Sequence, residues 1–471
     1  MSASSNFPPE KSTSVAIVGG GLAGLAAGCA LANSGFRVTL FERRPFLGGR
    51  ASSYQHPGTG EVVDNCQHVL LGCCTNLLDL YARTGVADKV AWYDRLTFLE
   101  PGGRASVIGA SALPAPLHTS PSFLGASCLG IKDKLAIARA MLALMPAVPY
   151  DNGDSFLVWL RGHGQTEPAI ERFWKTVLVS ALNDELERVS ITYAAQVFRE
   201  SFLKSAAAGR MGVPKVPLTE LYNAAGDYIS ARHGEVRLRA TIEAARFEPA
   251  KASLTSGGHE ESFDFAVFAV PYEPLVRILP KTLEADELRQ KAAHFESSPI
   301  TGIHLWFDRQ ISNLDHAVLL DRTIQWMFHK SRLLGRTADQ NGSYVELVVS
   351  SSKSLVEKSK QEIVDLAARE LNEFFPAARN AKLVKSAVIK EVHATYSPSP
   401  GIDAYRPGNS TAWPRVFLAG DWTATGWPAT MEGAVRSGYL AAQVLAKSAG
   451  KPSHFLVPDL PAAGLMRLFA K

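Results

Sequence analysis

The sequence predicts an α/β fold, in which a Rossmann-like domain with a parallel sheet carries an inserted α+β domain. Three observations predict it. An apolar strand, a glycine-rich turn and a helical run follow one another near the start of the chain, and a second strand-and-glycine pattern lies near residue 420. The 471 residues are also enough for two or three domains and a large buried core.

The first ordered unit has the pattern of a βαβ motif. Residues 14–18 are a short apolar, β-branched run, as in a buried strand. Residues 22–34 have helical composition and stop at Gly35, and residues 37–42 form a second strand pattern. This order predicts two parallel strands joined by a helix. Residues 1–13 are rich in Ser, Pro and Lys, and we expect a flexible tail there.

The turn between the first strand and the helix carries the pattern Gly19-x-Gly21-x-x-Gly24, with Ala23 inside it. Glycines at this spacing allow a tight turn, backbone approach to a pyrophosphate and close packing of helix on strand. The first backbone N–H groups of the helix then face the phosphates. Glu42 ends the second strand, where its carboxylate can accept hydrogen bonds from both hydroxyls of an adenosine ribose. Together these residues predict a dinucleotide site.

The segment from Glu42 to Arg50 reads Glu-Arg-Arg-Pro-Phe-Leu-Gly-Gly-Arg. Two glycines permit backbone approach, and a guanidinium offers a forked donor to phosphate oxygens. This continuation resembles the flavin amine oxidase and phytoene desaturase superfamily, which implies FAD as the cofactor. The resemblance places Gly49 and Arg50 against the pyrophosphate, and we include Arg43 in the same cofactor-binding segment.

A second flavin motif of that superfamily is predicted near the end of the chain. A strand pattern at residues 415–419 is followed by Gly420, Asp421 and a Gly/Ala-rich helix that begins near Thr430 and Met431. The resemblance implies that the aspartate meets the ribityl-pyrophosphate region and that the helix points its N-terminus at the flavin pyrimidine edge. A positive helix end there would stabilise the anionic reduced flavin.

Two further segments resemble strands of the same cofactor domain. Residues 234–238 resemble the strand in which a valine backbone, here Val236, meets adenine, and residues 263–271 resemble the strand that closes the domain. The cofactor domain must therefore be discontinuous, with the substrate domain inserted into it. The predicted boundaries are 14–75, 225–275 and 385–471 for the FAD-binding domain, and 76–224 and 276–384 for the substrate-binding domain.

The middle of the chain is less regular. Residues 167–183 and 358–375 have helical patterns, whereas residues 100–130 are rich in Pro, Ser, Gly and Ala and are expected to form loops. Residues 131–145 place Ile131, Leu135, Leu142 and Met145 on one helical stripe. The stripe is explained either by a helix that faces the core or by a surface helix that rests on lipid. Residues 460–471 are a second candidate for membrane contact.

Composition excludes several functions. Lys and Arg total 49 against 45 Asp and Glu, and 49 − 45 gives +4, too small a charge for a nucleic-acid partner. The five cysteines show no CxxC pattern, which argues against a zinc site or a disulfide framework and favours a reducing compartment. We expect no metal. Outside the glycine segment, no run of about 20 apolar residues could span a membrane.

Several segments together resemble the squalene-associated flavin desaturase-like proteins: residues 63–72, Phe173-Trp174, Ala181-Leu182-Asn183 and residues 420–434. The characterised activity of that family is hydroxysqualene dehydroxylase. The resemblance implies that reduced FAD removes the hydroxyl of hydroxysqualene, a C30 isoprenoid alcohol, to give squalene for hopanoid synthesis. It requires an electron donor, which the sequence does not identify. Because such substrates are nearly insoluble, we expect a cytoplasmic protein peripherally bound to the inner face of the membrane.

That hypothesis requires a proton donor for the departing water and a dry pocket rich in aromatic side chains. Asp64 and His68 are the candidate acids, because the resemblance places them just after the flavin-binding start of the chain. A structural hydrogen-bonding role is the alternative for both. Tryptophan rings can shield a cation, although they also belong in protein cores. The expected pocket residues are Trp174, Asn183, Trp422 and Trp427.

Three alternatives stay open. The nearest is a carotenoid-type oxidative desaturase, which has the same fold and FAD but moves electrons from substrate to flavin. A flavin amine oxidase is less favoured, because the sequence shows no flavin-linking cysteine or aromatic amine cage. A non-enzymatic isoprenoid-binding protein is the third, and the intact glycine motif, Glu42, Arg50 and Asp421 argue against it.

Overall fold

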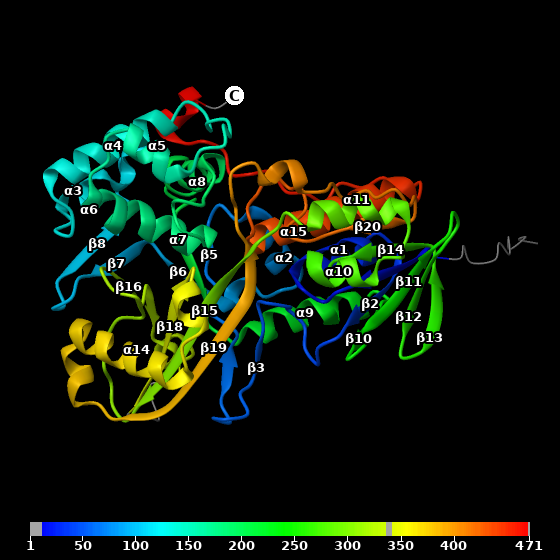
Figure 1. The fold of residues 1–471 in the computed structure, drawn as a ribbon, viewed down its shortest axis with the longest axis horizontal. Helices are drawn as coiled ribbons and strands as arrows, with labels where there is room; N and C mark the ends of the chain where they lie inside the picture. Colours follow the sequence, from blue (N-terminus) through cyan, green and yellow to red (C-terminus); the bar gives the residue numbers. More distant parts are fainter. Residues whose placement is uncertain (1–11, 336–341, 470–471) are drawn as a thin grey trace, which may run out of the picture.

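The computed structural model describes residues 12–335 and 342–469. A parallel-sheet region and a region of antiparallel strands and helices lie side by side, and two long strands run between them (Figure 1). Of the predicted tail, residues 1–11 lie outside the described residues. The predicted α/β architecture is confirmed.

The parallel sheet has five strands, and every neighbouring pair is parallel. Its central strand is buried along its whole length, because helices cover one face of the sheet and the small antiparallel sheet of residues 242–263 packs on the other. The chain pieces that form it come from three distant parts of the sequence, as the discontinuous domain requires. In order across the sheet, the strands are β10 (Glu235–Leu238), β2 (Arg37–Glu42), β1 (Ser14–Val18), β14 (Phe265–Phe268) and β20 (Val416–Leu418).

Small residues let three helices pack closely beside this sheet. Helix α1 (Leu22–Asn33) lies between α15 (Met431–Ser448) and α9 (Leu218–Ser230). A Cβ at Gly438 of α15 would lie 2.2 Å from the carbonyl oxygen of Ala23, so only glycine permits this crossing. The tight packing fixes the direction in which the N-termini of α1 and α15 point.

The second region is built on a seven-stranded sheet. Strands β15 and β19 form its long antiparallel pair and connect it to the parallel-sheet region (Figure 1). Helix α14 (Lys360–Phe374) packs on this sheet, with Ile363 and Leu371 buried in a shared apolar cluster. In order, the strands are β19 (Leu383–Tyr396), β15 (Ser297–Phe307), β18 (Ser343–Ser350), β17 (Trp326–Phe328), β16 (His316–Leu319), β7 (Arg95–Leu99) and β8 (Ala105–Gly109).

Three smaller sheets and several short helices complete the described part of the chain. The sheets are β11 (Ile242–Phe247) with β12 (Ala252–Ser256) and β13 (His259–Phe263); β5 (Leu70–Leu71) with β9 (Met211–Pro214) and β6 (Val90–Tyr93); and β3 (Ser53–Gln55) with β4 (Val62–Asp64). The remaining α-helices include α2 (Thr75–Arg83), α3 (Ser120–Gly125), α4 (Ile131–Leu144), α5 (Phe156–Gly162), α8 (Ile191–Phe198), α10 (Tyr272–Ile278), α11 (Leu283–Ala292), α12 (Lys330–Leu333) and α13 (Lys353–Val356).

Some predicted elements needed correction. The helix over 167–183 is interrupted, because a π-helical segment, η3 (Ile170–Lys175), separates α6 (Glu167–Ala169) from α7 (Thr176–Leu182). The expected loop 100–130 contains β8 and α3. The strand pattern at 234–247 is two strands, since Arg239 has a φ of 56° and its N–H donates to the carbonyl of Arg44, which turns the chain out of the sheet.

Three of the four residues in the predicted stripe of α4 face solvent, so the core-facing explanation is wrong for them, whereas the fourth, Met145, is buried. Ile131, Leu135 and Leu142 are 65, 66 and 65% exposed. The helix has a second apolar face, with Ile137 and Leu144 fully buried, and that face holds it on the protein. Among residues 12–335 and 342–469, no helix is long and apolar enough to cross a bilayer.

Candidate cofactor site and adjoining pocket

The glycine turn after β1 forms a tight cradle. Gly19 has a φ of 110°, and a Cβ at Gly24 would lie 1.9 Å from the carbonyl oxygen of Gly19, so the turn can close only without side chains. Gly21 forms a parallel bridge with Gly48, and a Cβ at Gly49 would lie 3.0 Å from the Cα of Gly21. The two predicted glycine segments therefore lie backbone to backbone.

The cradle fits a pyrophosphate. Gly21 is the N-cap of α1 and no side chain caps the helix, which leaves the first-turn N–H groups of residues such as Ala23 available to an anion. A Cβ at Gly21 would meet nothing nearer than the Cα of Gly49 at 3.9 Å, so there is room directly in front of the turn. A dinucleotide needs such unpaired N–H groups facing open space to bind its pyrophosphate.

Glu42 is fixed at the end of β2, where the ribose is expected. Its side chain is buried, and its two oxygens accept hydrogen bonds from the backbone N–H groups of Gly20 (2.7 Å) and Arg44 (2.8 Å). Val236 pairs with Leu40 of the neighbouring strand β2, and Leu238 of the same strand pairs with Glu42. Arg43, by contrast, is exposed, and it is the guanidinium of Arg44 that donates to the carbonyl of Gly49 at 2.9 Å. The sequence analysis missed that role of Arg44.

The two predicted FAD-binding segments, residues 42–50 and the segment that begins at Gly420, meet through an ion pair. Nη2 of Arg50 lies 2.8 Å from Oδ1 of Asp421, although the two residues are 371 positions apart. The other nitrogen, Nη1, donates to the carbonyl of Ala394 in β19. Gly420 precedes the aspartate with a φ of 149°, and its N–H donates to Ser437 of α15 at 2.8 Å. The ion pair therefore joins the glycine segment, the second sheet and the end of the chain.

The N-termini of α15 and α2 meet at a buried glutamate. Thr430 caps α15, since its hydroxyl accepts a hydrogen bond from the N–H of Gly433 at 3.0 Å, and Met431 begins the helix. Glu432 is fully buried and accepts hydrogen bonds from the N–H groups of Asn76 (3.1 Å) and Leu77 (2.8 Å) in α2. Glu432 thereby fixes α2 against α15. No local sequence signal predicts this contact.

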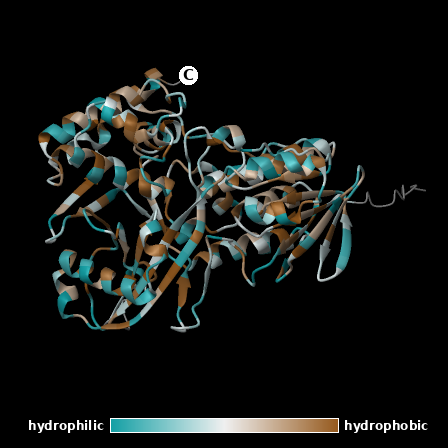
Figure 2. Ribbon diagram, in the orientation of Figure 1, coloured by the Kyte–Doolittle hydropathy of each residue, from teal (hydrophilic) through white to brown (hydrophobic). Residues whose placement is uncertain are grey.

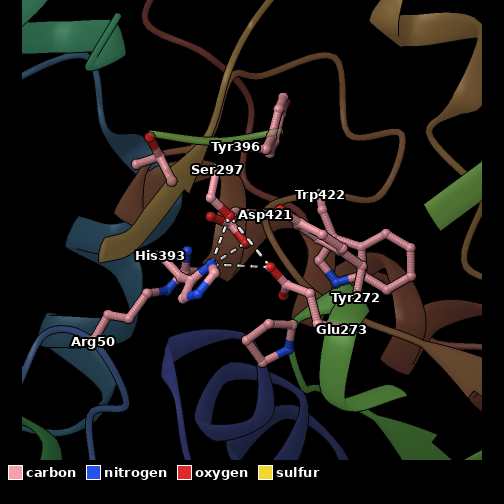
Figure 3. Close-up of a pocket in the computed structure, with 10 residues that line it drawn as sticks. Arg50, Tyr272, Glu273, Ser297, His393, Tyr396, Asp421 and Trp422 are labelled. Atoms are coloured by element: carbon pink, nitrogen blue, oxygen red, sulfur yellow. Dashed lines mark hydrogen bonds and ion pairs between the residues drawn. The ribbon is translucent and has the colours of Figure 1, made fainter. Parts of the chain in front are cut away.

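A polar pocket adjoins the Arg50–Asp421 pair at the junction of the two sheets (Figure 3). Within it, Glu273 and His393 form an ion pair at 3.3 Å when the imidazole is protonated, and the hydroxyl of Ser297 lies 3.0 Å from Nδ1 of His393. The residues that line the pocket are Arg50, Pro271, Tyr272, Glu273, Ser297, His393, Thr395, Tyr396, Asp421 and Trp422.

The structure corrects the acid role expected of Asp64. The carboxylate is buried; Oδ2 accepts a hydrogen bond from Nζ of Lys330 at 2.6 Å, and Oδ1 accepts one from the Ser53 hydroxyl at 2.6 Å. Burial alone would raise the pKa of Asp64, but the ammonium of Lys330 and these hydrogen bonds hold the pKa below its ordinary value. A carboxylate kept ionised in this way has no proton to donate.

His68 is suited to accept a proton rather than to donate one. Its Nδ1 lies 2.7 Å from the carbonyl oxygen of Cys66, and a carbonyl accepts, so Nδ1 carries the hydrogen and Nε2 keeps its lone pair. Burial lowers the pKa of His68, which favours the neutral imidazole at neutral pH. The acid role expected for His68 is therefore also corrected to that of a candidate base.

A buried polar cluster supports the segment that carries His68. The ammonium of Lys330 donates to Oε1 of Gln67 at 2.7 Å as well as to Asp64, and it lies 3.6 Å from the carboxyl of Glu346. Burial raises the pKa of Glu346 to about 8, so this carboxyl is mainly protonated at neutral pH. The cluster joins α12 and β18 to residues 64–67, and sequence reasoning missed both Lys330 and Glu346.

Two of the expected pocket residues belong to the core instead. Trp174 is fully buried among phenylalanines, and its indole N–H donates to Gln165 at 2.8 Å. Asn183 is buried, has a φ of 56°, and donates to the carbonyl of Ser298 at 3.0 Å while accepting from the N–H of Ser351 at 2.7 Å. These hydrogen bonds tie the end of α7 to β15 and to the residue after β18, which is a structural role.

The other two tryptophans lie near the cofactor residues. Trp422 lines the polar pocket, and its indole N–H donates to the carbonyl of Val270 at 3.0 Å. Trp427 is buried directly before α15, where the guanidinium of Arg436 lies 4.6 Å from its ring centroid. Both rings are held by these contacts and can form rigid walls around a bound group.

A glycine cradle at a helix N-terminus, a carboxylate at the end of the second strand and the Arg50–Asp421 pair define a dinucleotide-binding flavoprotein. The model of the family described as flavin containing amine oxidoreductase matches residues 22–446. The chain belongs to this family, and its cofactor is FAD. The protein is thus a flavin oxidoreductase.

Similar proteins of known name are desaturases. The chain is 28% identical to the 15-cis-phytoene desaturase of Synechococcus elongatus, over 92% of this chain and 95% of that protein. It is also 28% identical to the 15-cis-phytoene desaturase of Solanum lycopersicum, over 93% of this chain and 78% of that protein. A probable zeta-carotene desaturase of Synechococcus elongatus is 25% identical, over 92% of this chain and 98% of the relative.

Solved structures share the fold. A putrescine oxidase variant superposes with a TM-score of 0.71 at 15% identity, covering 93% of this chain and all of the other. An oxidoreductase from Methanosarcina mazei gives a TM-score of 0.70 at 17% identity, over 90% of this chain and 99% of the other. At these identities the likeness concerns the fold alone.

These relatives overturn the expected hydroxysqualene dehydroxylase activity. The matching proteins are named phytoene and zeta-carotene desaturases, which correspond to the alternative of a carotenoid-type oxidative desaturase. The four segments that suggested the dehydroxylase include positions that build the shared fold, such as Trp174 and Asn183, so they did not distinguish the direction of the redox reaction.

Proposed function

We propose that this protein is an FAD-dependent oxidative desaturase that acts on a long isoprenoid hydrocarbon of the carotenoid-precursor type. One observation carries the proposal: the similarity to a named 15-cis-phytoene desaturase extends over 92% of this chain and 95% of the relative. The similarity covers both the parallel-sheet region and the second region of the chain, so it includes the part expected to bind the substrate as well as the part that binds the cofactor.

Desaturation removes two hydrogens from adjacent carbons. FAD, when bound, supplies the acceptor for one hydrogen with its electron pair. The second hydrogen leaves as a proton, and the C–C double bond forms from the electrons of its broken C–H bond. Nε2 of His68 is the group of this chain that we assign to take that proton, because it is unprotonated and its ring is held by the carbonyl of Cys66.

The segment that carries His68 packs on an apolar core. A buried cluster on β18, β17, β9 and α12 includes Cys66, and this packing fixes the residue whose carbonyl holds the imidazole of His68. Its buried members are Cys66, Met211, Val213, Phe328, Leu333 and Val348.

The experiment is an anaerobic incubation of the yellow holoprotein with phytoene in detergent micelles. We expect the flavin absorbance to bleach and mass spectrometry to find a product two hydrogens lighter. Gly24→Val is the matched inactive control, since a side chain there collides with the carbonyl of Gly19 and excludes the cofactor. An oxidised flavin and unchanged phytoene would refute the proposal.

Two features of the setting complete the proposal. In the oxidative direction the redox partner, which is not identified, accepts electrons from the flavin instead of donating them.

A substrate of this kind dissolves in lipid, so we place the protein peripherally on a membrane. The cytoplasmic side is favoured by five cysteines that form no disulfide among the described residues. Fractionation of cells followed by detection of the protein in the washed membrane pellet tests this location.

A further inference from the structure

Exposed apolar side chains gather on one set of neighbouring elements. These elements are η2 (Leu117–Thr119), α3, α4 and the C-terminal η7 (Gly464–Phe469). They lie together in the upper left of the molecule, away from the glycine cradle (Figure 1), and hydrophobic ribbon is prominent there (Figure 2). We call the following exposed residues the docking face: Leu113, Leu117, Leu124, Ile131, Leu135, Leu142, Leu465 and Leu468.

Contacts between the elements make the docking face continuous. Nζ of Lys134 in α4 donates to the carbonyl of Leu124 in α3 at 2.7 Å. The N–H of Leu465 donates to the carbonyl of Ala115 at 2.8 Å, which seats η7 on the segment before α3. Met466 of η7 is buried against the core, so its neighbours at 465 and 468 are held facing outward.

The exposed charged side chains of α4 and η7 are cations. Within residues 111–150, the charged residues are Lys132, Asp133, Lys134 and Arg139. The carboxylate of Asp133 is occupied, since it accepts hydrogen bonds from the N–H of Gly130 and the hydroxyl of Thr166. Lys132 and Arg139 are exposed beside the apolar stripe, and Arg467 is exposed in η7. Exposed leucines flanked by cations match the interface of a bilayer that contains anionic lipids.

We propose that the docking face seats on an anionic lipid bilayer, with α4 lying in the plane of the interface. Ile131, Leu135 and Leu142 enter the boundary between headgroups and acyl chains, while Lys132 and Arg139 lie at the headgroups. The inference rests on the proposed function, because an enzyme with a lipid-soluble substrate needs a surface that contacts the bilayer. Exposed apolar patches rimmed by polar residues mark sites of contact with membranes or other proteins.

Vesicle flotation tests the proposal without any turnover. The holoprotein is mixed with vesicles of phosphatidylcholine alone or of phosphatidylcholine with phosphatidylglycerol. We expect I131Q/L135Q/L142Q to weaken partitioning at least about a hundredfold, because burial of one leucine-sized side chain corresponds to about tenfold or more. K132Q/R139Q should weaken binding to the anionic vesicles, by about fivefold for each lost cation, and leave binding to neutral vesicles nearly unchanged.

The matched control carries three polar substitutions at apolar residues exposed elsewhere. L283Q/V384Q/V392Q changes side chains on α11 and β19, and it should float like the wild type. Flavin absorbance and the thermal midpoint of each variant establish that it is folded. Unchanged flotation of I131Q/L135Q/L142Q, or an equal loss in the control, would overturn the proposal.

Two further measurements separate the possible outcomes. If the docking face binds a second copy of this chain, I131Q/L135Q/L142Q will change the sedimentation of vesicle-free protein from dimer to monomer, and the membrane assignment is then wrong. Turnover of phytoene in detergent should be unchanged in I131Q/L135Q/L142Q. Vesicle binding without turnover in the wild type would refute the desaturase function while the docking face stands.

Discussion

Replacement of Lys330 by methionine is the sharpest test of the buried polar cluster. The ammonium lies 2.6 Å from Asp64, and the two side chains are 2 and 3% exposed. Removal of the cation leaves a carboxylate buried without its partner, which costs about 3–5 kcal/mol. Because whole domains are stable by only about 5–15 kcal/mol, K330M should remove a large fraction of the free energy of unfolding.

Urea unfolding of the holoprotein, followed by circular dichroism, measures this loss. D64N/K330M should regain much of it, since the uncharged amide no longer needs a buried cation. The control is K385M: Lys385 lies 2.7 Å from Glu61, but the two side chains are 43 and 31% exposed, so we expect a loss of at most about 1 kcal/mol. A K330M protein as stable as K385M would refute the reasoning.

The remaining predictions concern neighbouring residues. The pKa of Glu346 is about 8 in the folded protein and 4.5 ordinarily, so the folded state holds an extra proton between these values and the free energy of unfolding should fall as pH rises from about 5 through 8. In E346Q, the urea midpoint should depend less on pH across this range. R50A should remove a forked hydrogen-bond donor from the cofactor site, so the dissociation constant for FAD in fluorescence titrations should rise. An unchanged constant would contradict this role of Arg50. H68Q should keep FAD but lower kcat for phytoene about a hundredfold or more; equal kcat would remove His68 as the base.

The parallel sheet was predictable because its signals are local. Strands β1 and β2 are short, largely apolar segments, and the turn of Gly19 to Gly24 needs glycine for steric reasons that the sequence displays directly. The resemblance placed Arg50 and Asp421 each beside the cofactor, but their ion pair was not predicted, since nothing local joins residues 371 positions apart.

The buried cluster and the pocket residues could not be predicted in this way. Lys330 and Glu346 look like ordinary surface residues in the sequence, and only the folding of α12 and β18 against residue 64 buries them. Trp174 and Asn183 have the chemistry of pocket residues, but the π-helical segment and a helix end turn them into the core. The stripe of α4 was ambiguous, because that helix has two apolar faces and its sequence does not say which one is buried.

The central claim is that electrons pass from an isoprenoid hydrocarbon to the flavin held by this chain. The most direct test is the visible spectrum of the oxidised holoprotein during anaerobic addition of phytoene, with the product identified by mass. The account predicts stoichiometric bleaching and one new double bond for each flavin reduced. A flavin that stays oxidised while phytoene persists would contradict it.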